Sequence, residues 1–330
     1  MIEAGSTSFL DSLCKGHESD WIFMIPSSIG EVAAVCTLLK AFRRHHEGKI
    51  HLVVHRRHED ILSLFEGHFD SYQTAPLTLM RSLISSRLID PSEFRTGRPI
   101  CLWAGQMYDG RLLDLHHLFT DHRGRGGLSF LDMYRYMMRL PWASEICPGK
   151  INLRLHEYAL SYSMKHGVEP GKSVIFFIGN NTNKPAPASL WESLASDFQK
   201  KGVKIFACTS GAKFLPTKFT LDVPFLEMTP GMAVAVSRIA GRVVSGANGV
   251  QFLSLVVDTP PMMDILLADR IIDEATGHFV YMNSNRSSHS TAVPELVINN
   301  QLYREWLIRE SASANELQEI GMALAKDHSG

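Results

Sequence analysis

Short apolar runs alternate with helical stretches along the chain, and this alternation constrains the fold more than any other feature. In the first half the apolar runs are 21–26, 50–55 and 99–105, and helical patterns occupy 32–44 and 59–65. β-rich runs that alternate with helices of about ten to fifteen residues are typical of βαβ units. Such units form parallel sheets covered on both faces. The first half therefore predicts a doubly wound α/β domain.

The second half repeats this pattern. Its apolar runs are 173–179, 204–209, 242–245 and 278–283, and its helical patterns are 188–200, 231–240 and 250–257. A chain of 330 residues is too long for one ordinary core. We therefore expect an α/β protein of two doubly wound parallel-sheet domains that face each other, at 1–160 and 161–330. The helical segment 153–166 and the turn after it mark the boundary. A last helix, 312–326, is a candidate to pack back across the first domain.

Composition and charge exclude several classes of protein. With 45% hydrophobic and 20% charged residues the chain is globular, and a net charge of −1 does not indicate a nucleic-acid partner. No apolar run reaches the roughly 18 residues that span a bilayer, and the first residues lack the apolar core of a secretory signal. The five cysteines are scattered and odd in number, which favours thiols in a reducing cytoplasm.

The turn Ser27-Ser28-Ile29-Gly30-Glu31 directly follows the first apolar run. In an open α/β sheet, ligands bind in the crevice beyond the carboxyl ends of the strands. A carboxylate placed there can act as a general base. Ser28 and Glu31 also have the spacing of a capping box, and the helix dipole favours an acidic residue in the first turn. Glu31 is therefore either a catalytic base or a helix cap.

Two loops of the second half have the chemistry of an anion site. After the run 173–179 come Asn180 and Lys184, and a lysine among amides at a sheet edge suits an anionic ligand. Later, Ser245, Asn248 and Gly249 join a strand to a helix, whose first N–H groups suit a diphosphate. The alternatives are a solvated lysine and an ordinary Asn-Gly turn.

These stretches together resemble the GT-B glycosyltransferases of the heptosyltransferase type, glycosyltransferase family 9. In that family the first strand runs into a Ser-Ser-Leu-Gly-Asp-type turn, whose carboxylate is the proposed base. A Lys-Arg-Trp-Pro-x-x-x-Trp-like segment is similar to 184–191, which keeps Lys184, a proline and Trp191 in register. A segment of the type Val-Val-Ser-Asn-Asp-Ser/Thr-Gly-Pro-x-His is similar to 243–252.

The resemblance implies a fold, an activity and a set of site residues. The fold is GT-B, with a Rossmann-like acceptor-binding domain at 1–160 and a Rossmann-like domain for the nucleotide sugar at 161–330. The activity is inverting transfer of a sugar to a saccharide of a bacterial surface glycan, of the lipopolysaccharide type. Glu31 is the implied catalytic base. The implied donor-binding residues are Asn180, Lys184, Ser245, Asn248 and Gly249. The residues expected to bind the acceptor are Ser28, Gly30, His122, Arg123 and Arg125, the last three on a basic, glycine-rich loop.

The expected cofactors and partners follow from the same resemblance and from the motifs of the chain. The nucleotide sugar is a substrate, so no cofactor is expected. The chain contains no D-x-D motif, and its histidines lack the spacing of a metal site, so we expect no metal. The partners are a nucleotide sugar and a saccharide acceptor, with no nucleic acid. We expect a cytoplasmic protein, and the inner face of the membrane is where it would meet a membrane-linked acceptor.

The chain departs from the family pattern at several positions. Glu31 is one methylene longer than the family's aspartate, and Ala247, Asn248 and Phe252 replace an aspartate, a Ser/Thr and a histidine. One alternative is therefore a catalytically silent protein of this fold that binds a nucleotide or glycan, or serves in assembly. A GT-B-fold sugar-nucleotide epimerase fits the fold but not the turn at Glu31. The aromatic run 130–142 has helical spacing and predicts core and cleft wall.

Overall fold

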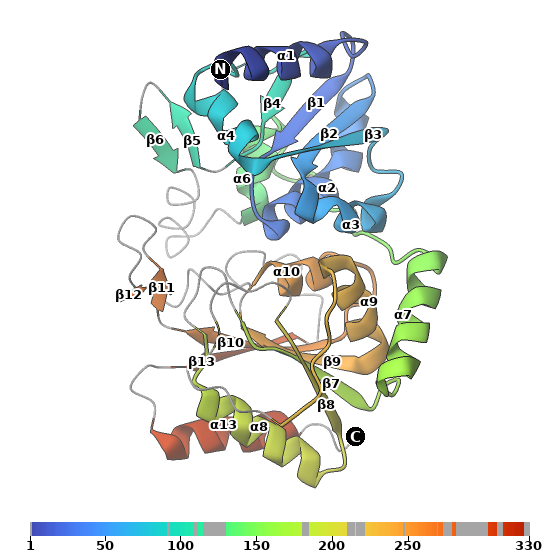
Figure 1. Cartoon of the computed structure of the whole chain (residues 1–330), viewed down its shortest axis with the longest axis vertical. Coiled ribbons are helices and arrows are strands. Elements are labelled where there is room, and N and C mark those ends of the chain that lie inside the picture. Colours follow the sequence, from blue (N-terminus) through green and yellow to red (C-terminus); the bar gives the residue numbers. More distant parts are fainter. Residues whose placement is uncertain are drawn as a thin grey trace. The chain divides into compact units, whose positions relative to one another are not determined.

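The chain divides into two compact units, Met1–Lys150 and Ile151–Gly330, and each is described by itself (Figure 1). The helix placed at the boundary by the sequence, α7 (Leu153–His166), belongs to the second unit. The computed structural model describes residues 2–90, 93–103, 105–108, 111–114, 130–179, 185–209, 215, 222–246, 248–268, 270–272, 279–281, 303–308 and 313–326.

The first unit is built on a four-stranded parallel sheet in the order β3-β2-β1-β4. Its strands are β1 (Trp21–Ile25), β2 (Ile50–His55), β3 (Ser71–Ala75) and β4 (Pro99–Cys101). β1 is central, since Ile22 pairs with His51 on one side and with Pro99 on the other. All four residues from Ile22 to Ile25 are fully buried, which is the apolar signature of a strand covered on both faces.

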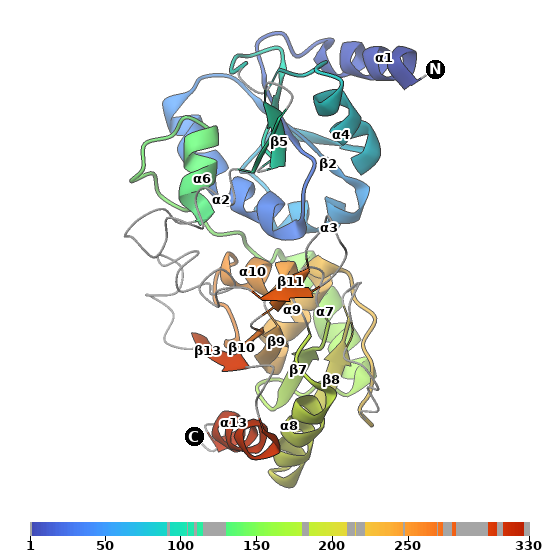
Figure 2. The same ribbon diagram turned by 90° about the vertical axis from the view of Figure 1, so that its left-hand side faces the viewer.

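Helices cover both faces of this sheet (Figures 1 and 2). On one face, α1 (Ile2–Cys14) and α4 (Leu77–Ser85) pack on the sheet, with Leu13, Leu83 and Met24 in one buried cluster. The other face carries α2 (Ile29–His45), α3 (Glu59–Leu62) and α6 (Phe130–Met137), and α2 contacts both of the others. The expected helix at 59–65 is shorter, because a 3₁₀ turn, Ser63–Phe65, follows α3.

The apolar run 99–105 was expected to be one strand, and that expectation is wrong. β4 ends at Cys101, and Gly105 begins β5 (Gly105–Tyr108), which pairs antiparallel with β6 (Arg111–Asp114) in a separate two-stranded sheet. The sequence also gave no indication of β3, whose Ser-Tyr-Gln-Thr-Ala has little of the apolar character of its neighbours.

The second unit is built on a five-stranded parallel sheet in the order β13-β10-β9-β7-β8. Its strands are β7 (Ser173–Phe177), β8 (Lys204–Cys208), β9 (Gly241–Gly246), β10 (Met262–Ala268) and β13 (Tyr303–Ile308). The first three were predicted. The run 278–283 was not the next strand of this sheet: it contains β12 (Phe279–Tyr281), which pairs antiparallel with β11 (Arg270–Ile272).

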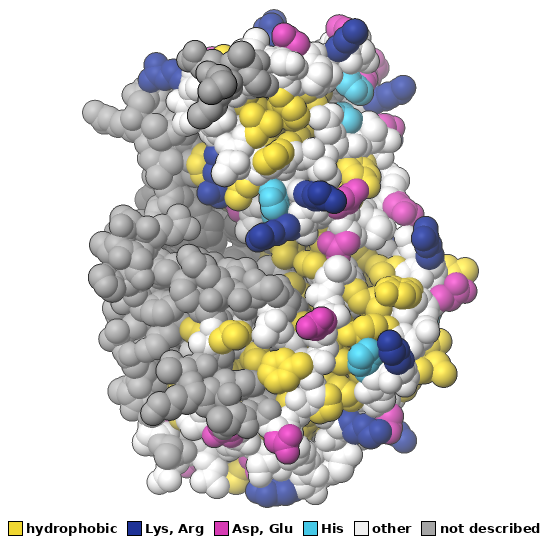
Figure 3. Space-filling view, in the orientation of Figure 1, with side chains coloured by type: hydrophobic (Ala, Val, Ile, Leu, Met, Phe, Trp, Pro, Cys, Tyr) yellow, Lys and Arg dark blue, Asp and Glu magenta, His cyan; other side chains and the backbone are white. Residues whose placement is uncertain are grey.

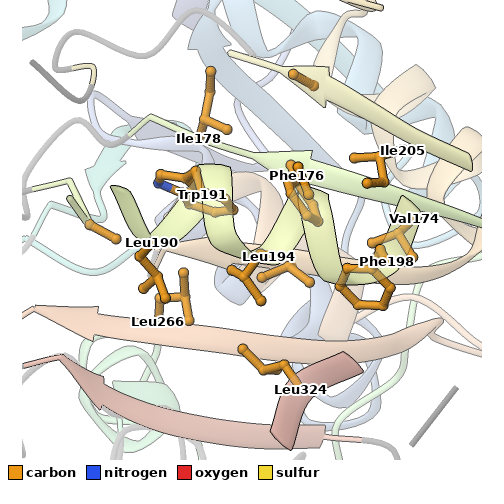
Figure 4. Close-up of a cluster of buried hydrophobic side chains, with 14 of the residues drawn as sticks. Val174, Phe176, Ile178, Leu190, Trp191, Leu194, Phe198, Ile205, Leu266 and Leu324 are labelled. Atoms are coloured by element: carbon orange, nitrogen blue, oxygen red, sulfur yellow. The ribbon is translucent and has the colours of Figure 1, made fainter. Parts of the chain in front are cut away.

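The two faces of the second sheet carry different helices (Figure 1). On one face α8 (Ala188–Lys200) and α13 (Ala314–Lys326) pack together, and α7, α9 (Pro230–Ala240) and α10 (Gly249–Leu255) lie on the other. Figure 4 shows Trp191, Leu194 and Phe198 of α8 against Val174 and Phe176 of β7, with Leu324 of α13 nearby. The last helix, which the sequence left open to cross back to the first domain, therefore packs on α8 within its own unit.

A side-chain network in the second unit ties three strands to α13. Asp264 of β10 is fully buried, and its Oδ2 accepts from Nε and Nη2 of Arg242 at 3.0 and 2.7 Å. Its Oδ1 accepts from Nε of Arg304 at 2.8 Å and from Nε1 of Trp306 at 3.0 Å, both in β13. Nη2 of Arg242 also donates to the carbonyl of Leu324 at 2.6 Å. One carboxylate thus links β9, β10, β13 and α13.

The surface of the second unit has an apolar area on α7, where Leu153, Tyr158 and Met164 are exposed (Figure 3). None of the helices among the described residues is long and apolar enough to cross a bilayer. All five cysteines are described, and none belongs to a disulfide.

We predict that Asp264→Asn destabilises the second unit by about 3–5 kcal/mol, because it leaves the buried Arg242 without its counter-charge. Urea unfolding followed by circular dichroism measures the change. The matched control is Glu169→Gln, which breaks the solvent-exposed pair of Glu169 with Lys204 in the same unit and should change the midpoint little. Equal effects of the two substitutions would contradict a central role for the network.

Candidate active site

The carboxyl end of β1 is where the topology of the first unit predicts a ligand site. The chain leaves β1 for α2 on one face of the sheet, and it returns from β3 through α4 to β4 on the other. The strand order therefore reverses between β1 and β4, and loops that diverge at such a switch point leave room for a ligand. Ser27, Ser28 and the first turn of α2 follow β1 there, and Trp103 follows β4.

Glu31 lies in the first turn of α2, and both of its carboxylate oxygens accept hydrogen bonds. Oε2 accepts from the backbone N–H of Ser28, the N-cap residue, at 3.0 Å, and the two residues form a capping box. Oε1 accepts from the phenol O–H of Tyr134 at 2.8 Å. The capping interpretation of Glu31 is therefore confirmed. It does not exclude a role as base, since each carboxylate oxygen keeps a second lone pair.

Burial raises the pKa of the Glu31 carboxyl above its ordinary value of 4.5. Three residues offset part of this effect by stabilising the charged form: Ser28 through its N–H and O–H, Tyr134 through its hydroxyl, and Arg81 through its positive charge. The residue keeps part of its surface accessible. A carboxyl group with a raised pKa, on a residue that keeps part of its surface exposed, has the properties of a general base.

Three residues near this end of β1 are not predicted from the sequence. Tyr134 lies in the run predicted as core and cleft wall, and it is fully buried. Its hydroxyl nevertheless donates a hydrogen bond to the carboxylate of Glu31. A tyrosine on the buried face of a helix needs a partner for its hydroxyl, and that requirement was the available signal. Nε of Arg81, on α4, donates to the carbonyl of Pro26 at 3.4 Å, and its guanidinium lies 5.1 Å from the ring centroid of Trp103. The sequence carried no signal for this pair.

The second unit has its switch point between β7 and β9. Asn248 begins α10 there: its Oδ1 accepts from the N–H of Gln251 at 3.0 Å, and its Nδ2 donates to Oγ of Ser245 at 3.0 Å. Nδ2 also approaches the carbonyl of Gly179, after β7, at 3.5 Å. Ser245 is buried, and its hydroxyl donates to the carbonyl of Gly246 at 2.7 Å. The side chains predicted to bind a donor are thus bonded within the turn.

The backbone of this turn remains suited to an anion. Helix geometry leaves the N–H groups of Gly249 and Val250 without acceptors inside α10, and both point out of its first turn. Phe252, which replaces the family's histidine, is buried, so its side chain packs in the unit and offers no polar group. Trp191, in register with the family's tryptophan, is also buried and lies 5.2 Å from Phe176, ring to ring.

The predicted site residues therefore fall into three groups. In the first unit, the structure brings Ser28, Gly30 and Glu31 together, with Ser28 exposed and Gly30 buried. In the second, it brings Ser245, Asn248 and Gly249 together. Asn180, Lys184, His122, Arg123 and Arg125 lie outside the described residues. Within the described part of the chain, no group of three His, Cys, Asp or Glu side chains could hold a metal ion.

Comparison with known proteins was informative at the level of structure alone. No family model matches the sequence, and no curated protein matches it. Among solved structures, the chain is similar to ADP-heptose lipopolysaccharide heptosyltransferase II of E. coli, with a TM-score of 0.59 and 12% identity over 94% of this chain and 100% of that one. It is also similar to the family 9 glycosyl transferase of Veillonella parvula, with a TM-score of 0.55 and 13% identity over 94% and 96%.

At this level of identity the likeness establishes the fold and nothing finer. It confirms the predicted α/β class with two Rossmann-like parallel-sheet domains. The chain has the GT-B fold, which these two glycosyltransferase structures share.

Proposed function

We propose that this protein is an inverting glycosyltransferase. It moves a sugar from a nucleotide-sugar donor to a saccharide of a bacterial surface glycan, of the lipopolysaccharide type. The observation that carries the proposal is the position of Glu31 at the switch point of the first sheet, where the residue is partly exposed and burial raises the pKa of its carboxyl. The similar E. coli protein, a lipopolysaccharide heptosyltransferase, supports the choice of donor and acceptor class.

The reaction is a single displacement at the anomeric carbon. The acceptor oxygen forms a bond to that carbon while its proton passes to Glu31. The bond from the carbon to the diphosphate breaks on the opposite side, and the nucleoside diphosphate leaves with the electron pair. Attack from the face opposite the leaving group inverts the configuration. The base lowers the barrier because it takes the proton as the oxygen becomes positively charged.

The donor side belongs to the second unit in this proposal. The free N–H groups at the start of α10 and the ammonium of Lys184 are the groups suited to the growing negative charge of the diphosphate. Asn248 and Ser245 would act by holding the turn in shape, because their side chains are already bonded to one another and to the backbone.

That internal bonding also favours a second candidate, a silent protein of the same fold that binds a nucleotide or glycan without catalysis. In this case the carboxylate of Glu31 would serve only as a cap. Assay of donor hydrolysis and transfer across a panel of nucleotide sugars separates the two, since a silent protein would bind a member of the panel and turn over none.

Glu31→Gln tests the base directly. Glutamine keeps the shape of the side chain and can complete a capping box, so the fold should be preserved. The amide cannot take a proton at neutral pH, so turnover should fall by roughly 10²–10⁴-fold with donor affinity retained. Steady-state kinetics and calorimetric titration of the nucleotide measure the two effects.

The matched control is Glu316→Gln. Glu316 accepts from the N–H of Ser313 at 2.7 Å, the same cap contact at the start of α13. The Glu316→Gln substitution should leave turnover unchanged. Near-normal activity in folded Glu31→Gln would show that Glu31 is a cap and not a base.

Lys184→Ala tests the donor side. If the lysine faces the diphosphate, its loss should weaken nucleoside-diphosphate binding and slow the chemical step, with a combined loss of about 2–4 kcal/mol in kcat/KM. The acceptor KM should stay the same. Lys172→Ala, which removes an exposed lysine ahead of β7, is the control. Normal nucleotide binding by Lys184→Ala in calorimetry would place the lysine in solvent.

We expect activity without a divalent metal, because a lysine and a helix N-terminus can together neutralise the leaving diphosphate. Turnover should survive EDTA. Activity that vanishes with the chelator and returns with Mg²⁺ or Mn²⁺ would contradict this view of the phosphate site.

A further inference from the structure

We propose that Tyr134 is the positioning residue of Glu31: its phenol hydroxyl, by donating to Oε1, holds the carboxylate in one orientation and in its ionised form. The inference rests on the proposed function and deepens it, because it names the group that sets the pH range in which the base works.

The geometry of the pair supports this role. Tyr134 projects from α6 and is fully buried, and α6 packs on α2, the helix that carries Glu31. The two residues are 103 positions apart, yet their oxygens lie 2.8 Å from each other. The Ser28 N–H holds Oε2 at 3.0 Å. With Tyr134 donating to Oε1 and Ser28 donating to Oε2, rotation of the carboxylate plane is restricted.

The donor must be neutral, and its surroundings keep it so. Burial and the adjacent negative charge of Glu31 raise the pKa of Tyr134 well above its usual value of 10. The phenol therefore stays protonated across the range in which a carboxylate titrates. A group that stays protonated can only donate to the carboxylate, and this contact favours the charged form.

Other groups face Glu31 from the remaining elements of the unit. Arg81 on α4 favours the ionised carboxylate by its positive charge. The buried thiol of Cys101 on β4 has a pKa raised by burial and by the charge of Glu31, so it stays neutral and adds no charge of its own. Among the described side chains of α4, β4 and α6, Tyr134 is the one that donates a hydrogen bond to Glu31.

The direction of the expected change follows from these contacts. Glu31 must be ionised to act as a base, so kcat/KM falls as the pH drops through its pKa. In Tyr134→Phe the donor to the charged form is gone while burial remains. The pKa of Glu31 should therefore rise by about one to two units, the size of a hydrogen bond to a charged group. The acid limb of kcat/KM should move to higher pH by the same amount.

A purely structural tyrosine would behave differently. If the hydroxyl only helps to hold α6 on α2, its removal would lower stability and leave the titration of Glu31 and the acid limb in place. Tyr136→Phe is the matched control. It removes the same hydroxyl from the same helix at a position that is 58% exposed, and it should shift neither quantity.

The test is a ¹³C-carboxyl NMR titration of labelled glutamate, with the Glu31 signal assigned by its loss in Glu31→Gln. The pH profile of kcat/KM is measured in parallel on the same variants. If Tyr134→Phe folds poorly, 3-fluorotyrosine at position 134 keeps the shape. Because fluorine withdraws electron density, that residue is a stronger donor, and it should lower the pKa of Glu31.

The outcomes separate the inference from the function on which it rests. A higher Glu31 pKa in the NMR titration of Tyr134→Phe, or a lower Glu31 pKa with 3-fluorotyrosine, supports the role of Tyr134. An unchanged Glu31 pKa in both overturns it, whatever the activity. If the Glu31 pKa shifts while the acid limb of kcat/KM stays in place, the contact with Tyr134 is supported but Glu31 is not the base of the reaction.

Discussion

The parallel pairing of β1 with both of its neighbours is the constraint on which the candidate site depends. Ile22 is in register with His51 of β2 and Pro99 of β4, so β1 lies in the middle of its sheet. The connection from β1 to β2 runs through α2 on one face of the sheet, and the connection from β3 to β4 runs through α4 on the other, so the strand order reverses beside β1. Glu31, Arg81 and Trp103 all lie near this switch point.

The carboxylate of Glu31 combines a helix-capping contact with a raised pKa, two properties that usually compete. As the third residue of α2, Glu31 caps the helix through Ser28, which requires a charged or polar acceptor in a fixed place. As a candidate base, it needs a pKa closer to neutral than that of a solvated glutamate. Burial supplies the second property, and the hydrogen bonds that oppose it are the ones that hold the side chain still.

The two edges of the sheet in the second unit carry different polar groups. Arg242 and Asp264 lie in the earlier parts of β9 and β10, where they join these strands to β13 and α13. The carboxyl edge carries the turn of Ser245 and Asn248, whose side chains are bonded within it and leave backbone N–H groups at its helix.

The sequence by itself determined the α/β class, the two domains, most strands and the turn at Glu31, because these depend on local periodicity and on a strand followed at once by a helix. It did not reveal β10 and β13, since Asp264 and the charged residues of β13 interrupt the apolar pattern, and they are tolerated only because they bond to each other across strands. Nor did it pair Tyr134 with Glu31 or place α13 on α8. Those contacts join residues far apart in the chain, and the tertiary structure alone decides which buried hydroxyl meets which carboxylate.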